Sequence, residues 1–238
     1  MFTPTMLLDR FAESLEHRQQ HWGQRQRDLA KDKSNVHAAT LAITREAGTP
    51  GTSVAREVGA RLDWPVYDHE LVELIAQETG LRTNLLDSVD EHHRPWLLEC
   101  FESLGSARRL SESGYAVHVL ETVVALGLQG HCVIVGRGAA HILPSFSTLR
   151  VRLVGLLEDR VANAARQQNL SREEAARWVE KTDCERTEFV KAHFFKDPAD
   201  PRHYDLVLNT SRWSVSECAD LIVRALHQLE SQLMNSAS

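Results

Sequence analysis

The sequence predicts an α/β protein built on a mostly parallel five-stranded sheet with helices on both faces. Between residues 38 and 227, short apolar segments of strand length alternate with segments whose apolar residues recur at helical spacing. Glycine turns directly follow two of the strand-like segments, at residues 47–51 and 136–138. Right-handed crossovers bring the carboxyl ends of parallel strands to one edge, where open α/β sheets bind their ligands. Both turns are therefore candidate binding loops.

The composition of the 238 residues excludes several classes of protein. Charged residues make up 25% of the chain and the net charge is −6, which argues against a broad nucleic-acid footprint. No run of about 18 apolar residues is present, and the acidic N-terminal segment does not resemble a signal peptide. We expect a cytoplasmic protein with no nucleic-acid and no membrane partner. Reduced thiols are expected at four widely scattered cysteines without zinc-site spacing, Cys100, Cys132, Cys184 and Cys218.

The first strand, turn and helix have the layout of a phosphate-binding loop. The apolar run 41–43 is followed by the glycine turn, and Val54, Val58 and Leu62 then continue at helical spacing. Backbone N–H groups in such a turn, followed by a helix N-terminus, offer fixed donors and partial positive charge to an anion. An ordinary strand-to-helix turn with cap residues is the alternative.

The residues of this turn depart from the Walker pattern G-x-x-x-x-G-K-[ST]. Arg45, Pro50 and Gly51 stand where the two glycines and the lysine belong, and only Thr52 fits. Arg45 supplies a cation at the mouth of the turn. Thr52 and Ser53 supply hydroxyls, either as helix caps or as ligands of a phosphate-bound Mg²⁺.

Further along the chain, polar residues follow the strand-like segments. Asp68 ends a second strand, and Arg137 lies inside the second glycine turn after the strand at 131–135. A capping box at Ser171–Glu174 starts a long helix, and 204–209 reads as the last strand. The long helix carries Lys181, Asp183 and Arg186, and it also carries Lys181, Glu185 and Glu188 at the spacing of a salt-bridged surface helix.

Several ordered short motifs carry a resemblance to a known family: 43–48 (ITREAG), 65–68 (PVYD), 133–138 (VIVGRG), 183–186 (DCER) and 204–210 (YDLVLNT). Over about residues 38–227 the chain resembles the cytidylate-kinase-like family of P-loop nucleoside monophosphate kinases. The resemblance implies a three-layer P-loop kinase fold with strand order 2-3-1-4-5. It also implies ATP and Mg²⁺ as cofactors, a CMP-like nucleoside monophosphate as acceptor, and a mobile arginine-bearing lid.

The pattern of residues along the chain also predicts how it is divided. Residues 1–37 would be a helical appendage and 38–230 the kinase-like domain, followed by a tail at 231–238. Within the domain, we expect inserted helices at about 81–112 and the lid at about 171–203. A homodimer is left open.

By the same resemblance, catalytic roles fall to Arg45, Arg137 and Arg186. Thr52 is also the metal-site residue, holding Mg²⁺ through the phosphates. The nucleotide-binding residues implied are Ala47, Gly48, Thr49, Gly51, Thr52, Ser53, Asp68, Arg160, Lys181 and Asp183.

Three departures from the family pattern leave a second function open. The nearer relatives also lack the lysine at Gly51, but they usually carry glycine at Pro50 and arginine at Thr52. Proper cytidylate kinases carry an acid at Gly138, which bears on recognition of the base. The alternative to a kinase is a non-catalytic nucleotide- or phosphate-binding module with a degenerate loop.

Overall fold

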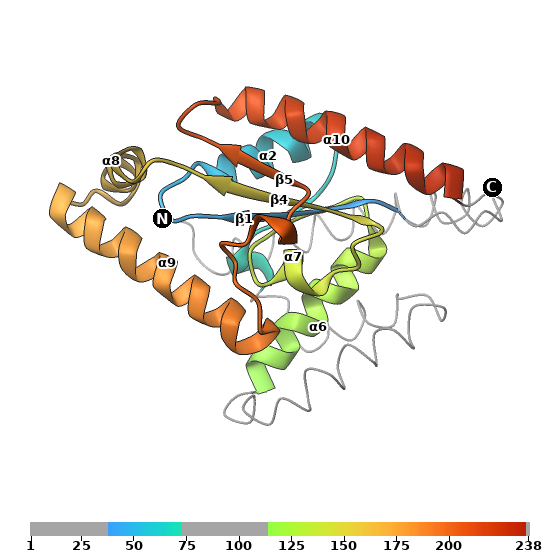
Figure 1. The fold of residues 1–238 in the computed structure, drawn as a ribbon, viewed down its shortest axis with the longest axis horizontal. Helices are drawn as coiled ribbons and strands as arrows, with labels where there is room; N and C mark the ends of the chain where they lie inside the picture. The colour runs from blue at the N-terminus through green and yellow to red at the C-terminus, as the bar shows by residue number, and fades with distance from the viewer. Residues whose placement is uncertain (1–37, 73–113, 237–238) are drawn as a thin grey trace. The chain divides into compact units, whose positions relative to one another are not determined.

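The computed structural model describes residues 38–72 and 114–236, and these form a three-layer α/β domain (Figure 1). Five strands make one sheet in the order β2-β3-β1-β4-β5, and every strand pair is parallel. The predicted fold class and strand order are therefore confirmed. The predicted appendage at 1–37 and inserted helices at 81–112 lie outside the described residues.

The strands are β1 (Thr40–Arg45), β2 (Val66–Tyr67), β3 (Val133–Val135), β4 (Thr148–Val154) and β5 (Leu206–Asn209). The helices are α2 (Gly51–Leu62), α6 (Gly114–Gln129), α7 (Ala139–Ile142), α8 (Leu157–Gln168), α9 (Arg172–Phe194) and α10 (Val215–Ser236), with a 3₁₀ turn η1 (Pro201–His203). Because α10 continues to Ser236, residues 231–236 belong to this helix rather than to a tail.

The central strand β1 fixes where the site lies. Ile43 is in register with Val135 of β3 and with Val151 of β4, and the last residue, Arg45, is opposite Leu153. The carboxyl ends of the three strands therefore meet at one edge. In Figure 1, α8 and α9 lie beyond this edge.

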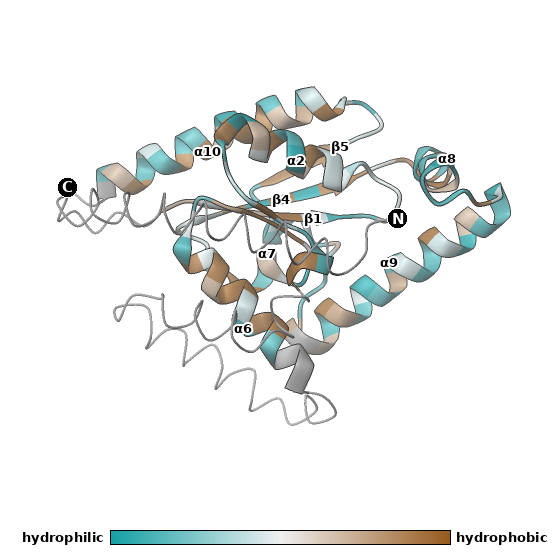
Figure 2. Cartoon of the chain, turned by 180° about the vertical axis from the view of Figure 1, so that it is seen from behind, coloured by the Kyte–Doolittle hydropathy of each residue, from teal (hydrophilic) through white to brown (hydrophobic). Residues whose placement is uncertain are grey.

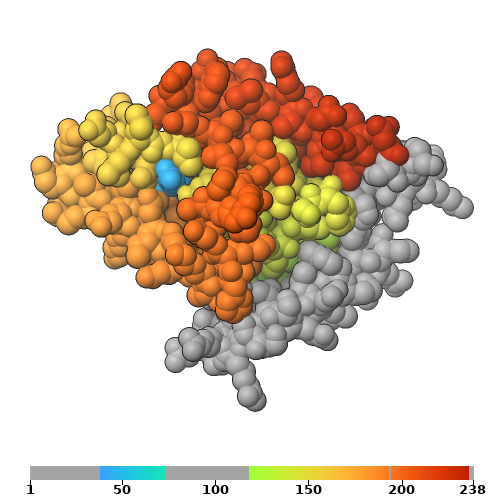
Figure 3. Space-filling model, viewed as in Figure 1, coloured from blue at the N-terminus to red at the C-terminus, as the bar shows by residue number. Residues whose placement is uncertain are grey.

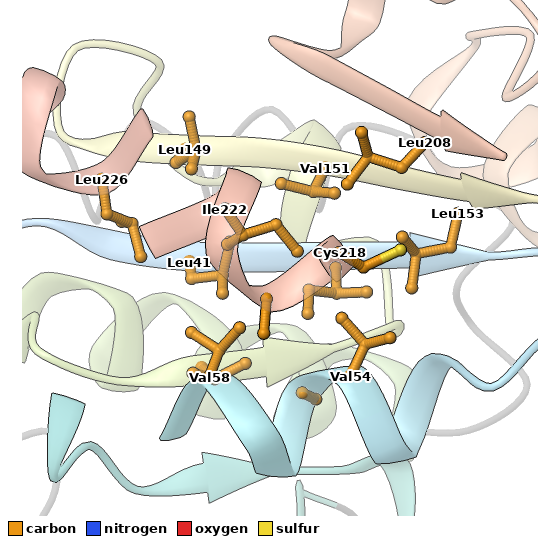
Figure 4. Packing of buried hydrophobic residues seen from close by; sticks show 14 of the residues in the cluster. Leu41, Val54, Val58, Leu149, Val151, Leu153, Leu208, Cys218, Ile222 and Leu226 are labelled. Atoms are coloured by element: carbon orange, nitrogen blue, oxygen red, sulfur yellow. The ribbon is translucent and has the colours of Figure 1, made fainter. Parts of the chain in front are cut away.

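Helices cover the sheet because its strands are apolar on both faces. Figure 1 shows α2 and α10 on one side, and α6 and α7 on the other. In Figure 4, Val54 and Val58 of α2 and Ile222 of α10 point toward Leu41 and Val151 of the sheet; these residues are fully buried. Such a core anchors the start of α2, and with it the loop that precedes this helix.

The crossover helix α6 is apolar on most sides, as its sequence predicts. Val119, Leu120, Val123 and Val124 are all buried, and Figure 2 shows mostly hydrophobic colours along the described part of α6. Among the helices that the structure describes, none combines the length and hydropathy needed to cross a membrane. The described cysteines are free thiols: Cys132, Cys184 and Cys218.

The region after α6 differs in part from the sequence expectation. The short helix α7, which no sequence pattern predicted, starts directly after the second glycine turn, with Gly138 in the left-handed conformation (φ 75°). The capping box of Ser171 and Glu174 is present, and α9 then runs unbroken to Phe194. Most of the predicted lid is therefore one regular helix.

Candidate functional site

The loop at residues 46–50 joins β1 to α2 in a compact turn. Both the backbone N–H and the hydroxyl of Thr49 donate to the carbonyl oxygen of Glu46, at 3.3 and 2.7 Å. Gly48 has φ +80°, and a Cβ at this position would overlap the carbonyl oxygen of Arg160. The turn therefore requires glycine for both conformation and space. Pro50 does not flatten it, because Pro50 serves as the N-cap position of α2.

The start of α2 has free donors. No side chain caps this helix, and the N–H groups of Gly51, Thr52 and Ser53 make no hydrogen bond within residues 38–72 and 114–236. The hydroxyls of Thr52 and Ser53 also make none there, so neither acts as a cap. Orphan N–H groups at a helix start, together with the helix dipole, favour an anion.

Arg45 lies beside this helix start. A Cβ at Gly51 would lie 2.9 Å from Cγ of Arg45, and a Cβ at Gly136 would overlap Nη1 of the same side chain. The side chain therefore passes between the two glycine turns. The pKa of Arg45 is lowered to about 9, mainly by burial and also by the charges of Arg186 and Arg137, with a partial offset by Asp68.

Arg137 lies in a turn of three consecutive left-handed residues. Gly136, Arg137 and Gly138 have φ values of 83°, 50° and 75°. A non-glycine residue with positive φ is uncommon, and such conformations concentrate at functional sites. Burial lowers the pKa of Arg137. Because its charge acts on both Arg45 and Arg186, the turn places it in the same charge cluster.

Arg186 reaches this cluster from α9. Its Nη1 donates to the carbonyl oxygen of Arg45 at 3.1 Å. Burial lowers its pKa; Arg137 lowers it further, whereas Asp183 and Glu185 raise it. Among the described residues, neither Arg45 nor Arg186 forms an ion pair with an acid. The three arginines predicted from sequence therefore come together as a half-buried group of cations.

Asp68 and His69 lie at the edge of this cluster. The Asp68 carboxylate accepts a hydrogen bond from the Leu71 N–H at 3.1 Å and also acts on the charge of Arg45. Burial, Arg45 and Arg137 together lower the pKa of His69. Sequence reasoning missed His69, although its position directly after Asp68 at a strand end was the available signal.

A second group of residues braces the loop from α8 and α9. Asp183 accepts from the Ala47 N–H at 2.7 Å and from Nη1 of Arg160 at 2.6 Å. Arg160, whose side chain is only 12% exposed, also donates to the carbonyl oxygen of Ala47, and Asn163 donates to that of Gly48 at 2.6 Å. Two residues assigned to the nucleotide, Arg160 and Asp183, are thus engaged by the protein, and the Ala47 N–H is occupied.

Glu46 completes the brace and was also missed. Its carboxylate accepts from the Gly155 N–H at 3.1 Å and lies 3.4 Å from Arg160 and 3.6 Å from Arg152. Acids at strand ends look alike in a sequence, and only the structure shows that Glu46 binds Arg160 and the Gly155 N–H, whereas Asp68 acts on the charge of Arg45. The brace fixes the loop without using the cluster cations.

Lys181 does not join the site in this structure. Its side chain is 77% exposed and pairs with Glu185 at 3.8 Å, as expected for a surface helix. The alternative of a salt-bridged helix face is therefore confirmed for this pair. On the same helix, Asp183 and Arg186 point toward the loop because they lie on the other side.

The end of α9 and the segment that follows it pack against the domain. Phe194 packs against His141 and occupies the space that a Cβ at Gly138 would need. Pro198 is buried, and its carbonyl oxygen accepts from the hydroxyl of Tyr204 at 2.9 Å. The last part of the predicted lid therefore packs against the domain, whereas its mobility stays a prediction.

The surface view shows the loop region at the bottom of a hollow. In Figure 3, blue atoms from the N-terminal part of the domain are visible between α8 and α9 on one side and the segment after α9 on the other. A separate hollow of about 310 Å³ lies between α8 and α9, lined by Leu157 and Val161 among others, and it contains none of the arginines of the cluster.

The domain combines a P-loop-like turn, a strand order of 2-3-1-4-5 and a cluster of arginines at the strand ends. Together these features restrict the families to which the chain can belong. The family model described as "Cytidylate kinase-like family" matches residues 40–212. The chain belongs to the cytidylate kinase-like family. The matched range includes the loop, the second glycine turn and the whole of α9. Every residue of the site described above therefore lies within the family domain.

The chain is also similar to two individual proteins. A curated protein, the cytidylate kinase of Methanopyrus kandleri, is 31% identical over 110 residues, which are 42% of this chain and 57% of that enzyme. A solved structure of an uncharacterized protein from Eubacterium ventriosum matches with a TM-score of 0.65 at 18% identity, covering 80% of this chain and 98% of that one. The second similarity shows a shared fold.

Proposed function

We propose that this protein transfers a phosphoryl group from ATP to a CMP-like nucleoside monophosphate. The convergence of Arg45, Arg137 and Arg186 beside the uncapped start of α2 carries the proposal. Three desolvated cations repel one another, so the arrangement is costly unless an anion with several charges joins them. Family membership and similarity to a cytidylate kinase support a nucleotide as that anion.

In this proposal, the chain acts mainly by positioning and by charge, as phosphoryl transfer requires. The N–H groups of Gly51, Thr52 and Ser53 would hold the donor phosphates. Arg45 and Arg186 would spread positive charge over the oxygens of the group in transfer. Such prearranged groups lower the barrier because they need no reorganisation when charge develops.

Thr52 fits the role of Mg²⁺ ligand through its hydroxyl, which is half-exposed and makes no hydrogen bond in the part of the chain that the structure describes. When bound there, Mg²⁺ would offset the negative charge of the phosphates. Within the described residues, no group of three or more His, Cys, Asp or Glu side chains could hold a metal alone. A metal that arrives with the phosphates agrees with that finding.

The acceptor would lie on the β2–β3 side of the cluster. Arg137, at the end of β3, would hold the monophosphate, and Asp68 and His69, directly after β2, would border it. α9 would exclude water, since an open site would hydrolyse ATP. At Gly138, where proper cytidylate kinases carry an acid, the ring of Phe194 fills the space that a side chain would need. The base of the acceptor is therefore proposed only as CMP-like.

A coupled assay of ATP consumption against a panel of nucleoside monophosphates tests the proposal. We expect turnover with at least one monophosphate, and R45A should lower kcat by about 100- to 1000-fold, as removal of one prearranged donor does. The exposed Arg224 of α10 provides the control, because R224A removes the same charge away from the loop. Nucleotide binding without turnover would favour a binding module, and absence of both would overturn the proposal.

A further inference from the structure

The residue at the Walker lysine position is the most unexpected feature of the loop. Gly51 is the first residue of α2, and its backbone is helical rather than left-handed. Glycine in a helix is less favourable than alanine, by about 1 kcal/mol in a helix interior. The backbone therefore gives no reason for glycine here, and the reason must lie in the space that a side chain would fill.

That space is occupied by Arg45. A Cβ at Gly51 would lie 2.9 Å from Cγ, 3.0 Å from Cβ and 3.3 Å from Cδ of Arg45, all closer than ordinary carbon contacts. The other end of the side chain runs past Gly136, where a Cβ would overlap Nη1. The two glycines thus flank the arginine along its length, one at the stem and one at the guanidinium.

We infer that Gly51 is a positioning residue: the side chain it lacks leaves the space through which Arg45 passes beside the start of α2, so the strand arginine takes the place of the Walker lysine. The inference rests on the proposed function for the role of the cation, but not for the packing. On this inference the site keeps its positive charge, but the charge comes from the end of β1 instead of the start of α2. A lysine at residue 51 would then displace the working cation.

The charge environment agrees with this inference. Although burial and two neighbouring arginines lower the pKa of Arg45 to about 9, the side chain remains cationic at pH 7. Arg186 donates to the backbone carbonyl oxygen of Arg45, so the position of the strand end is also fixed from α9. The backbone of Arg45 is therefore held from α9, and its side chain lies in the space that the two glycines leave.

A charge-swap experiment tests the role of the cation, with tripolyphosphate as the probe and calorimetry as the measurement. We expect R45A and G51K each to weaken binding by about 10-fold or more, as loss of a charged hydrogen-bonding group does. The double variant R45A/G51K should bind more tightly than either single variant, because the lysine then has room. Tighter binding by G51K alone, or a double variant no better than R45A, would overturn the inference.

Unfolding in urea tests the packing without any ligand. We expect G51A to lower the midpoint in the presence of Arg45 and to lower it much less in the R45A background. The control G127A crowds the Leu143 side chain under α6 instead, and its effect should be the same in both backgrounds. Equal effects of G51A in both backgrounds would overturn the inference. If the wild-type protein binds no tripolyphosphate, the proposed function fails while this cycle still decides on Gly51.

Discussion

At the scale of single residues, the turn at residues 136–138 shows how the fold aims a side chain. Three successive left-handed residues are an unusual arrangement, and the middle one carries a long cationic side chain. Holding a non-glycine residue in such a region costs on the order of 1–3 kcal/mol. The surrounding strand and helix therefore stabilise a conformation whose benefit is the placement of Arg137 beside Arg45 and Arg186.

Replacement of Arg137 by alanine should separate the two substrates. Alanine has the same Cβ as arginine, so the strain of the turn is unchanged and only the guanidinium is lost. We expect about 10- to 100-fold weaker binding of the monophosphate, with a much smaller change for ATP. Calorimetric titration with each ligand measures both, and R137K tests whether charge alone suffices. Equal losses for the two ligands would contradict the assignment of Arg137 to the acceptor.

Part of the site could be predicted from sequence, because a residue at or just beyond the carboxyl end of a parallel strand lies at the binding edge. Arg45 ends β1, and Asp68 and Arg137 follow β2 and β3 within two residues. The roles of residues on α9 are harder to predict, since the sequence does not show which side of this helix faces the loop. Lys181 was therefore assigned to the nucleotide although it points away, and Asp183 although it binds Ala47. Hydrogen bonds between distant segments, such as Asn163 to Gly48, leave no local pattern.

At the scale of elements, periodicity predicted the long helices and the buried strands but not α7, which has only four residues. This short helix supports the segment after α9. The ring of His141 contacts the rings of Phe194, His203 and Tyr204, and within the described residues neither ring nitrogen has a hydrogen-bond partner. Burial without a hydrogen-bond partner favours the neutral form of the ring, so we expect docking of the segment to weaken at low pH.

The pKa of His141 is lowered from 6.5 to about 4, mainly by burial and also by the positive charges of Lys196, His203, Arg152 and Arg150. Above pH 6.5 the histidine is neutral in the folded and unfolded states and has no effect. As the pH falls toward 4, protonation favours the unfolded state. With allowance for solvent screening, we expect the wild type to lose about 1–2 kcal/mol more than H141F between pH 7 and 5. Urea unfolding at both pH values measures this loss.

The control for this pH dependence is H227Q, which removes an exposed histidine of α10. H141F should differ little from the wild type at pH 7, because no hydrogen bond of the imidazole is lost. A wild type and an H141F variant with the same pH dependence would show that the segment accommodates the charged ring. The docked segment would then have no link to the protonation of His141.

At the scale of the whole domain, one helix contacts both the proposed donor site and the proposed acceptor site. α9 reaches the loop through Asp183 and Arg186, and its end reaches the second glycine turn through Phe194. The donor and acceptor sides of the site are therefore linked by a single rigid element. In a kinase, such a link would make closure over one substrate depend on the other.

Hydrogen exchange can detect this closure. In the ligand-free protein, D183A removes the acceptor of the Ala47 N–H and one partner of Arg160, a loss of about 1–2 kcal/mol. We therefore expect amide exchange across residues 181–203 to become about 5- to 30-fold faster. The control E185A removes a carboxylate from the same helix. Among the described residues Glu185 forms an ion pair only with the exposed Lys181, at 3.8 Å, so exchange should change little.

In the wild type, ATP with Mg²⁺ and a nucleoside monophosphate should slow exchange over residues 181–203 more than anywhere outside the phosphate loop. The reason is that phosphates between the arginines would remove the repulsion that now opposes the approach of Arg186 to Arg45 and Arg137. Either substrate alone should give a smaller effect, because each neutralises only part of the cluster. If exchange across this range is unchanged by both substrates together, α9 is not a lid, and the binding module becomes the better account of the fold.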